Sequence, residues 1–480
     1  MLGETLASQS GVQAGVSAVY HYTLEETEMS EAKHQARESE LVKEALRIGP
    51  QADRRQFFVS AAAFGAAAAA PALAQAQAPA AAPATAPAPA RKVLLKDDSR
   101  LLNIGATVRS GNYWNFSTYM TPVEEFYVRN HYPTPLVEAK PVLDPRNWKL
   151  KVHGNAVERP IEIGFDDLMK MPSRTVVATM ECHGNGRSLF WEQQDMKEVA
   201  GGNWVLGAVG QAEWQIVPMS HILGLVGLKR DAKSALFWSG VDGNDMGRPL
   251  PVSELTSRGD DIGVCFRMNG NALTADHGAP VRLVVPGWGG TASIKWLTEI
   301  RIDSHQHWCR LNTRGETYIG PSYAAPAISP NDEFIGGITP ADVKGPMVMW
   351  MPIKTLITVP LVLEKSPSVP ANYPLKRGEW PTMSAGRQLV RGYAWAPQYG
   401  IREVEYRVDA GPWQRAHIQG PNLGRYTWVR FDFNWDARPG NHVIETRGID
   451  MAGNTQPETV PLNVLGMANG AIPKFKIRVV

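Results

Sequence analysis

The chain has 480 residues, 44% of them hydrophobic and 20% charged, and this length predicts at least two domains because single cores rarely grow beyond ~250–300 residues. Its net charge is only +2, from 49 basic and 47 acidic residues, which argues against non-specific binding of nucleic acid. The three scattered cysteines and the lack of a Cys-x-x-Cys-His sequence exclude a disulfide framework, a four-sulfur metal site and covalent haem attachment.

The first hundred residues have the composition of an export signal and a linker. An arginine pair in Asp53–Val59 precedes an alanine-dominated apolar run to Ala70, as in twin-arginine signals, which export folded proteins to the periplasm. We expect residues 1–76 to be a lead and signal peptide, with Met29 as a second candidate start, and 77–99 to be an Ala/Pro-rich linker. An alanine-rich buried helix is the alternative, whereas an apolar run of about fourteen residues is short for a membrane span.

Residues 92–345 have the pattern of a mixed α/β domain. Strand-like runs such as Leu283–Val285 and Ile294–Ile302 are separated by Gly and Pro, and Phe165–Met171 and Met219–Gly227 are helical candidates. The regular β-α alternation of a doubly wound sheet is missing. No Gly-x-Gly-x-x-Gly or Walker pattern follows a strand, so a nucleotide cofactor lacks support.

From about Gly345 the pattern changes to short alternating strands. Apolar and polar residues alternate in Val404–Val408 and again in Thr427–Phe433, and His442–Arg447 follows a Pro-Gly turn. Such strands, separated by turns over about 110 residues, predict a β-sandwich of immunoglobulin type. The Pro- and Lys-rich segment 366–381 is expected to be a loop.

Cys182 is the first candidate for chemistry. It lies where a β-prone run, Thr175–Met180, opens into a Gly/Asn loop, a position that would expose a thiolate to a cavity. A buried small hydrophobe is an alternative, because free cysteine is among the most buried residue types. A cysteine-nucleophile hydrolase is another, although no local signature supports it.

Three segments carry polar and cationic side chains that could accompany Cys182. Singly, each of these side chains is most simply a solvated charge. On strands or at loop ends they could converge on one anionic group, which together with Cys182 suggests a thiolate metal ligand beside an anion-binding cofactor cradle. The side chains are Arg129, Asn130, His131, His277, Arg282, Ser293 and Lys295.

A second metal site is conceivable at His305, His307 and Cys309. Alternate positions of a strand would turn all three side chains to one face, as a zinc or copper site requires. An ordinary half-buried strand explains the same residues equally well.

Taken in chain order, these motifs resemble the sulfite oxidase family of molybdopterin enzymes, from about residue 100 to residue 475. The resemblance implies an α+β fold, with a mixed α/β molybdopterin-binding catalytic domain over 100–345 and an immunoglobulin-like β-sandwich dimerisation domain over 346–480. The matching motifs are Phe126–His131, Glu181–Asn185, Gly207–Trp214, Asp276–Gly287, Lys295–Leu297, Gly392–Trp395 and Gln456–Glu458.

The resemblance also assigns roles to single residues. Cys182 would be the equatorial thiolate ligand of molybdenum, and Arg129 would face the metal and hold an anionic substrate. The active-site tyrosine would be Tyr318, which follows the His-Trp motif after extra residues. The positions that match cofactor-holding residues are Tyr127, Val128, Arg129, Asn130, His131, Asp242, His277, Arg282, Ser293, Ile294 and Lys295.

The chemistry of this family implies a partner. Oxygen transfer to a sulfur lone pair releases two electrons, which must leave singly. Because the chain has no haem motif, the expected acceptor is a periplasmic c-type cytochrome subunit. The resemblance of the C-terminal part further implies a homodimer within a heterotetramer.

One departure from the family pattern bears on the substrate. Sulfite oxidases have Asn-x-Arg-Gly where this sequence has Asn463–Gly466, with Leu465 at the arginine position. Loss of a paired cation from a desolvated anion site can cost ~2–5 kcal/mol, which disfavours a compact dianion such as sulfite. The pattern therefore favours sulfane sulfur on a carrier protein, as in Sox-type sulfane dehydrogenases. A free-sulfite dehydrogenase and a non-catalytic assembly protein are the alternatives.

Overall fold

The computed structural model describes residues 94–105, 107–113, 116–137, 140–199, 204–239, 247–359 and 382–480. All of them belong to one compact unit, Ala90–Val480. The expected signal peptide, the first part of the expected linker, Asp242 and the expected loop at 366–381 lie outside the described residues. Within the described ranges, no helix is long and apolar enough to cross a membrane.

In its described residues, the first part of the unit is built on two five-stranded sheets. All strand pairs in them are antiparallel except β4 and β13, which are parallel. One sheet has the order β11 (Asn271–Ala272), β10 (Gly263–Met268), β7 (Val209–Pro218) and β6 (Arg174–Glu181), with β12 (Arg282–Val284) also paired to β10. The other has the order β5 (Ile161–Gly164), β4 (Lys149–His153), β13 (Leu297–Asp303), β8 (Ser234–Ser239) and β9 (Gly247–Pro251).

Two small sheets and several short helices complete this part. The small sheets are β1 (Leu102–Gly105), β2 (Val108–Ser110) and β3 (Val128–Arg129), and β14 (His307–Trp308) with β15 (Glu333–Phe334). The α-helices are α2 (Phe165–Lys170), α3 (Leu189–Gln193), α4 (Met219–Val226) and α5 (Val252–Ser257). The 3-10 helices are η3 (Pro141–Leu143), η4 (Ala275–His277), η5 (Gly290–Ala292), η6 (Arg310–Asn312) and η7 (Pro340–Asp342).

Both helices predicted from periodicity are confirmed. Helix α4 buries Met219, Ile222, Leu223 and Val226, the i, i+3, i+4, i+7 stripe that an amphipathic helix turns to a core. It ends at Val226, and the following Gly227 has a φ of +67°, which glycine adopts at little cost.

The strand predicted over Ile294–Ile302 is wrong for its first three residues, because β13 begins only at Leu297. Trp296 has a φ of 56°, which breaks an extended strand, and its indole nitrogen donates to the carbonyl of Ala275 at 2.9 Å. The chain therefore bends just before β13. Ser293 and Lys295 lie in this bend and not on one face of a strand.

The predicted β-sandwich is present in the C-terminal part. Its inward residues from both sheets share one hydrophobic core, and β22 alternates buried and less buried positions along its length. In the described residues, one sheet has the order β16 (Lys354–Val359), β18 (Gly386–Trp395), β22 (Val429–Ala437) and β21 (His417–Gln419). The other has the order β17 (Thr382–Met383), β24 (Lys474–Val479), β23 (Gly440–Asp450), β19 (Ile401–Val408) and β20 (Gln414–Arg415).

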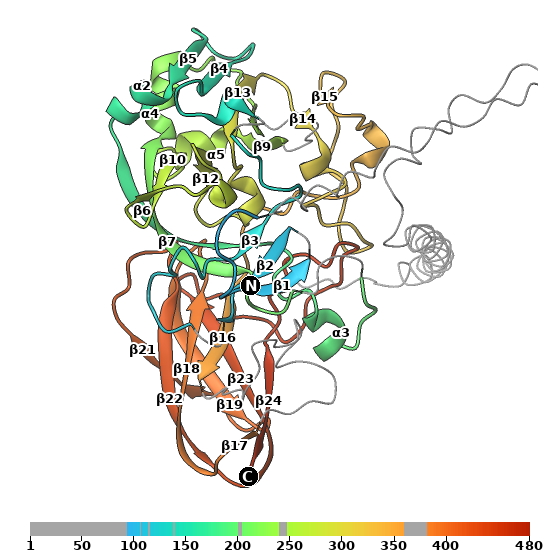
Figure 1. Cartoon of the computed structure of the whole chain (residues 1–480). Coiled ribbons are helices and arrows are strands. Elements are labelled where there is room, and N and C mark those ends of the chain that lie inside the picture. The colour runs from blue at the N-terminus through green and yellow to red at the C-terminus, as the bar shows by residue number, and fades with distance from the viewer. Residues whose placement is uncertain are drawn as a thin grey trace, which may run out of the picture. The chain divides into compact units, whose positions relative to one another are not determined.

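The sandwich strands gather at one end of the unit, while β4, β5 and β13 lie at the other end (Figure 1). The small sheet of β1, β2 and β3 lies between the two ends (Figure 1). The sandwich core also contains Tyr113, Phe116 and Val209 from the first part of the chain. The two parts therefore share buried apolar surface, and the contact between them is part of the folded core.

Candidate active site

A cavity with about 690 Å³ of empty space, part of it open to solvent, lies beside the ends of β3, β6 and β12. Of the predicted site residues that the structure describes, all line it except Val128 and Tyr318. The residues of its wall are Phe126, Tyr127, Arg129, Asn130, His131, Tyr132, Met180, Cys182, Ser239, His277, Arg282, Gly290, Thr291, Ser293, Ile294, Lys295 and Trp296.

Cys182 follows directly after β6 and is 8% exposed at the cavity wall. Its backbone N–H donates to the carbonyl of Ala208 at 2.9 Å, which fixes the start of the loop. Burial raises the pKa of the Cys182 thiol and Glu316 raises it further, while Arg129 and Arg187 oppose this effect. A bound metal ion would displace the thiol proton, because the thiolate is the form that ligates metals.

A buried charge network holds the residue before the cysteine. The Lys354 ammonium donates to Glu181 Oε1 at 2.6 Å and to the carbonyl of Asn185 at 2.6 Å. The Trp395 indole donates to Glu181 Oε2 at 2.8 Å, and the Asn185 amide donates to Glu181 Oε1 at 2.9 Å. Lys354 and Trp395 belong to the sandwich, so the C-terminal part positions the cysteine loop.

His183, the residue after Cys182, is also held by several hydrogen bonds. His183 Nε2 lies 3.1 Å from both the backbone nitrogen of Gly289 and the carbonyl oxygen of Met349, and His183 Nδ1 lies 2.6 Å from Glu316 Oε2. Burial alone would raise the pKa of Glu316, but the hydrogen bond from His183 and the charge of Arg248 hold it well below its usual range. A Cβ on Gly289 would lie 2.1 Å from the His183 ring, so only glycine fits there.

The three cations of the cavity wall, Arg129, Arg282 and Lys295, have no carboxylate within ion-pair distance among the described residues. Lys295 Nζ donates to Asn130 Oδ1 at 2.7 Å and to the carbonyl of Asp276 at 2.6 Å. The Arg282 guanidinium donates to the carbonyls of His277 and Ser293, at 3.1 and 2.8 Å. These hydrogen bonds go to neutral acceptors and not to carboxylates, so the cavity is electrostatically suited to an anionic ligand.

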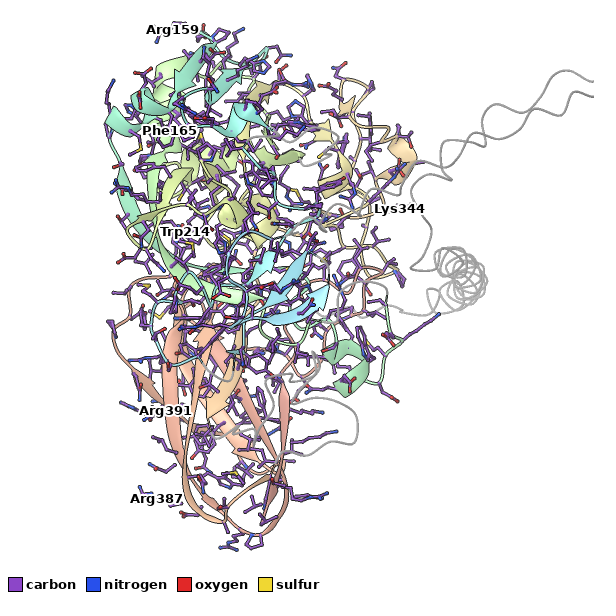
Figure 2. The ribbon with its side chains drawn as sticks, in the orientation of Figure 1. Arg159, Phe165, Trp214, Lys344, Arg387 and Arg391 are labelled. Atoms are coloured by element: carbon purple, nitrogen blue, oxygen red, sulfur yellow. The ribbon has the colours of Figure 1, made fainter. Side chains whose placement is uncertain are left out.

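Burial disfavours the protonated forms of Arg282 and Lys295. The Arg282 guanidinium lies over the ring of Trp214, the buried tryptophan labelled in Figure 2, at 5.3 Å from the ring centroid. Burial lowers the pKa of Arg282 to about 10 and that of Lys295 well below its usual value, and the charge of Arg282 lowers the pKa of Lys295 further. An anion bound between them would raise the pKa of both groups and so favour their charged forms.

A segment expected to be linker contributes to the site. The backbone N–H groups of Leu95 and Lys96 donate to Asp276 Oδ2 at 2.9 and 2.6 Å. The Lys96 ammonium donates to the carbonyls of Val123 and Phe126 and lies 3.5 Å from His277 Nε2. The catalytic part thus begins before residue 100.

Three buried polar atoms of cavity-wall residues have no hydrogen-bond partner among the described residues. They are His131 Nε2, Ser239 Oγ and Thr291 Oγ1. Arg129 Nη2 lies 3.2 Å from His131 Nδ1, and because guanidinium only donates, Nδ1 accepts and Nε2 carries the ring proton. Buried unpaired groups are rare and costly, so these atoms mark where a polar ligand binds.

Two predicted residues lie away from this wall. Val128 is fully buried against Leu94 and Leu101, and it does not line the cavity. Tyr318 stacks on Tyr323 with ring centroids 4.8 Å apart, and burial raises its pKa to about 12. The extra residues after the His-Trp motif form η6 and the following turn, so the structure does not bring Tyr318 to the described cavity.

Sequence reasoning missed several residues that shape the site. Asp276 was noticed only as part of a motif, and Lys96, Glu316 and Lys354 gave no local signal because their partners lie far along the chain. The Gly287–Gly290 run was the one available hint, since clustered glycines mark a close approach of backbone to another group.

The comparisons with known protein families agree with this geometry. Residues 137–309 match the family described as oxidoreductase molybdopterin binding domain, and residues 374–480 match the Mo-co oxidoreductase dimerisation domain. The chain belongs to the sulfite oxidase family of molybdopterin oxidoreductases. As in that family, its molybdopterin-binding domain takes the molybdenum–molybdopterin cofactor.

Relatives within and beyond the sulfite oxidase family align over most of this chain. Mitochondrial sulfite oxidase of Rattus norvegicus is 28% identical over 380 residues, which cover 76% of this chain and 62% of the relative. Nitrate reductase [NADH] 2 of Phaseolus vulgaris is 28% identical over 384 residues, 75% of this chain and 39% of the relative. The chain thus spans less than two thirds of the length of these relatives.

A solved structure has the same fold. The sulfane dehydrogenase SoxCD from Paracoccus pantotrophus matches with a TM-score of 0.60 and 24% identity, covering 77% of this chain and 84% of that chain. The fold of the sulfite oxidase family predicted from the motifs is therefore confirmed.

The donor set of the cavity fits the cofactor of the family. Cys182 would supply the thiolate ligand of the metal, while Lys295, Arg282 and the N–H of His131 would hold the anionic and polar parts. We expect Lys295→Gln to weaken cofactor retention by about tenfold or more, since a charged hydrogen bond contributes ~1.5–3 kcal/mol. Molybdenum and pterin content per chain after prolonged dialysis measures this loss.

Lys149→Gln is the matched control for that experiment. Lys149 pairs with Glu162 on an exposed surface, with 60% of its side chain accessible, and does not line the cavity. Equal molybdenum content in the two variants would contradict the cofactor-holding role of Lys295.

Proposed function

We propose that this chain is the molybdenum-carrying catalytic subunit of a periplasmic enzyme that oxidises sulfane sulfur bound to a cysteine of a carrier protein. Its electrons pass to a c-type cytochrome subunit, and two copies pair through the C-terminal sandwich. The family membership, the dimerisation domain and the likeness to a sulfane dehydrogenase support this proposal. The twin-arginine pattern supports periplasmic export, although it lies outside the described residues.

Leu465 is the observation that carries the choice of substrate. Its carbonyl accepts a hydrogen bond from Arg187 Nε at 3.0 Å, and Arg187 is a buried cation whose charge acts on the Cys182 thiol. An arginine at 465, as in the sulfite oxidase pattern, would add a second cation to the segment whose backbone binds Arg187. With leucine there, a compact dianion is less well compensated, and a less charged sulfur tethered to a protein is favoured.

The chain's own residues bind and orient the reacting groups. When bound, the cofactor supplies two-electron oxygen-atom transfer to sulfur, and each oxygen added consumes one water and releases two protons and two electrons. Arg129 is held by its hydrogen bond to the carbonyl of Asn130 at 2.6 Å and by His131, so its charge faces the cavity in a fixed orientation. Burial and the charge of Arg129 lower the pKa of His131 to about 3, which keeps this donor neutral at physiological pH.

The deciding experiment is a steady-state assay of the chain purified with its cytochrome. Cytochrome reduction is followed with sulfite alone and with a carrier protein loaded with sulfane sulfur. We expect kcat/KM for the loaded carrier to exceed that for free sulfite. Fast turnover of free sulfite with no carrier would reject the sulfane assignment in favour of a sulfite dehydrogenase.

Leu465→Arg tests the charge argument directly. We expect it to raise kcat/KM for free sulfite relative to the loaded carrier by about tenfold or more, because the added cation restores part of a ~2–5 kcal/mol interaction. Val464→Arg is the matched control, because it adds the same charge at the adjacent position, and Val464 is 41% exposed. If both variants change the ratio equally, the effect is one of general surface charge and the role given to position 465 is wrong.

A further inference from the structure

A cluster of four metal-ligating side chains lies away from the cofactor cavity. Asp303 ends β13, His305 follows it, His307 begins β14 and Glu333 begins β15. One nitrogen or oxygen atom from each of the four lies within 4.8 Å of the corresponding atoms of the others. None of the four lines the cavity that holds Cys182.

The local strand geometry explains why these residues meet. The chain bends at Ser304 and His305 between the end of β13 and the start of β14, and this bend brings His307 Nε2 within 2.8 Å of Asp303 Oδ2. The parallel pairing of β14 with β15 places Glu333 directly beside His307. Cys309 leaves the group, because its thiol donates to the carbonyl of Gly247 at 3.0 Å.

Hydrogen bonds orient the imidazole rings of His305 and His307 as in metal-binding histidines. His307 is fully buried, with Nδ1 3.0 Å from Ser234 Oγ and Nε2 2.8 Å from Asp303 Oδ2. A hydroxyl partner on one ring nitrogen fixes the ring so that the other nitrogen faces a metal. His305 turns Nε2 to the same centre, 3.1 Å from Glu333 Oε2.

Arg301 provides the simplest competing explanation of the carboxylates. Its Nε lies 2.8 Å from Asp303 Oδ2, and its Nη2 pairs with Glu333 Oε2. One guanidinium leaves two carboxylates with an excess negative charge when both histidines are neutral. Each carboxylate oxygen also has two lone pairs, so Arg301 can stay bound on the outside while the inner lone pairs ligate.

We propose that Asp303, His305, His307 and Glu333 bind one divalent transition-metal ion, for which Zn²⁺ is the best chemical match. Two imidazole nitrogens and two carboxylate oxygens form a tetrahedral set that Zn²⁺ accepts at ~2.0–2.2 Å per ligand. Because all four positions come from the protein, the site is structural. It fastens β15 to the end of β13 and so ties both ends of the segment that carries Glu316, the partner of His183 beside Cys182.

The test uses the full chain, treated with EDTA, dialysed and titrated with zinc sulfate in a calorimeter. We expect one zinc per chain, and tetrahedral absorption bands when Co²⁺ replaces it. His305→Ala should weaken zinc binding by about 100-fold or more, since loss of an outer-shell partner alone costs 10–100-fold. His153→Ala is the matched control, because His153 pairs with a single carboxylate, Glu299, at 2.8 Å.

A second measurement keeps the test independent of how His305→Ala folds. Zinc should raise the Tm of the wild-type chain by roughly 2–5 °C and leave that of Glu333→Gln nearly unchanged. Lack of zinc binding by the wild-type chain, or equal binding by His305→Ala and His153→Ala, overturns the proposal and leaves the ion-pair network around Arg301. Molybdenum content, measured on the same samples, should not change, so this outcome is separate from that of the proposed function.

Discussion

Replacing Cys182 by serine is expected to abolish turnover while the fold is retained. Serine removes the thiolate that the cavity offers to the metal but changes little volume at a site that is 8% exposed. We expect kcat to fall by more than the ~10²–10³ that loss of a single electrostatic donor costs, since a metal ligand holds the reacting centre itself. Steady-state turnover, with circular dichroism and molybdenum content of the same preparation, measures the effect.

Cys265→Ser and Cys309→Ser are matched controls for the loss of a buried thiol. Both cysteines are buried, and both donate their thiol proton to a backbone carbonyl, of Arg267 and Gly247 respectively. Neither lines the cavity. We expect near-normal turnover from both, and activity of Cys182→Ser at their level would contradict the ligand assignment.

Replacing Lys354 by methionine should destabilise the chain and disturb the cysteine loop together. The ion pair of Lys354 with Glu181 is buried, with side chains 2% and 1% exposed and a distance of 2.6 Å. Removing one partner leaves an uncompensated buried charge, so we expect a loss of ~3–5 kcal/mol in the free energy of unfolding. Because Glu181 precedes Cys182, kcat should fall as well. Urea unfolding and steady-state turnover measure the two effects.

Two further variants separate this effect from a general loss of charge. Lys149→Met breaks an exposed ion pair with Glu162 and should cost only ~0–1 kcal/mol. The double variant Lys354→Met with Glu181→Gln should be more stable than Lys354→Met, because the orphaned carboxylate is gone and the amide still accepts from Trp395. If Lys354→Met is as mild as Lys149→Met, the network does not position the loop.

The dependence of the cysteine loop on the sandwich gives the two-part fold a functional reason. Lys354 and Trp395 reach across from the C-terminal part to Glu181, and Asn469 donates to the carbonyl of Gly186 at 3.1 Å. A chain truncated before the sandwich would lose these contacts. The position of the metal ligand is therefore a property of the whole unit and not of the molybdopterin-binding part alone.

Several helices and strands could be predicted from the sequence, because their apolar and polar patterns depend on neighbouring residues. The helix Met219–Val226 and the alternating strand Val429–Ala437 follow from which residues within one turn or one pleat are apolar. The motifs around Arg129, Cys182 and Arg282 could be assigned to one cavity because family resemblance supplied the long-range proximity that spacing does not. The bend before β13 escaped prediction, since the left-handed Trp296 is stabilised by a hydrogen bond to Ala275 far from any strand signal.

The composition and chain pattern were enough to establish a large, nearly neutral protein of two parts in which three cysteines leave little choice of a thiolate ligand. Only the tertiary structure decided which charges remain uncompensated. Lys295 and Arg282 bond to an amide and to carbonyls, while Glu181 pairs with Lys354 and Glu316 contacts His183, residues more than a hundred positions away. Electrostatic pairing depends on distance in space, which one-dimensional spacing does not contain. The same reason separates Cys309 from His305 and His307 and replaces it with Asp303 and Glu333.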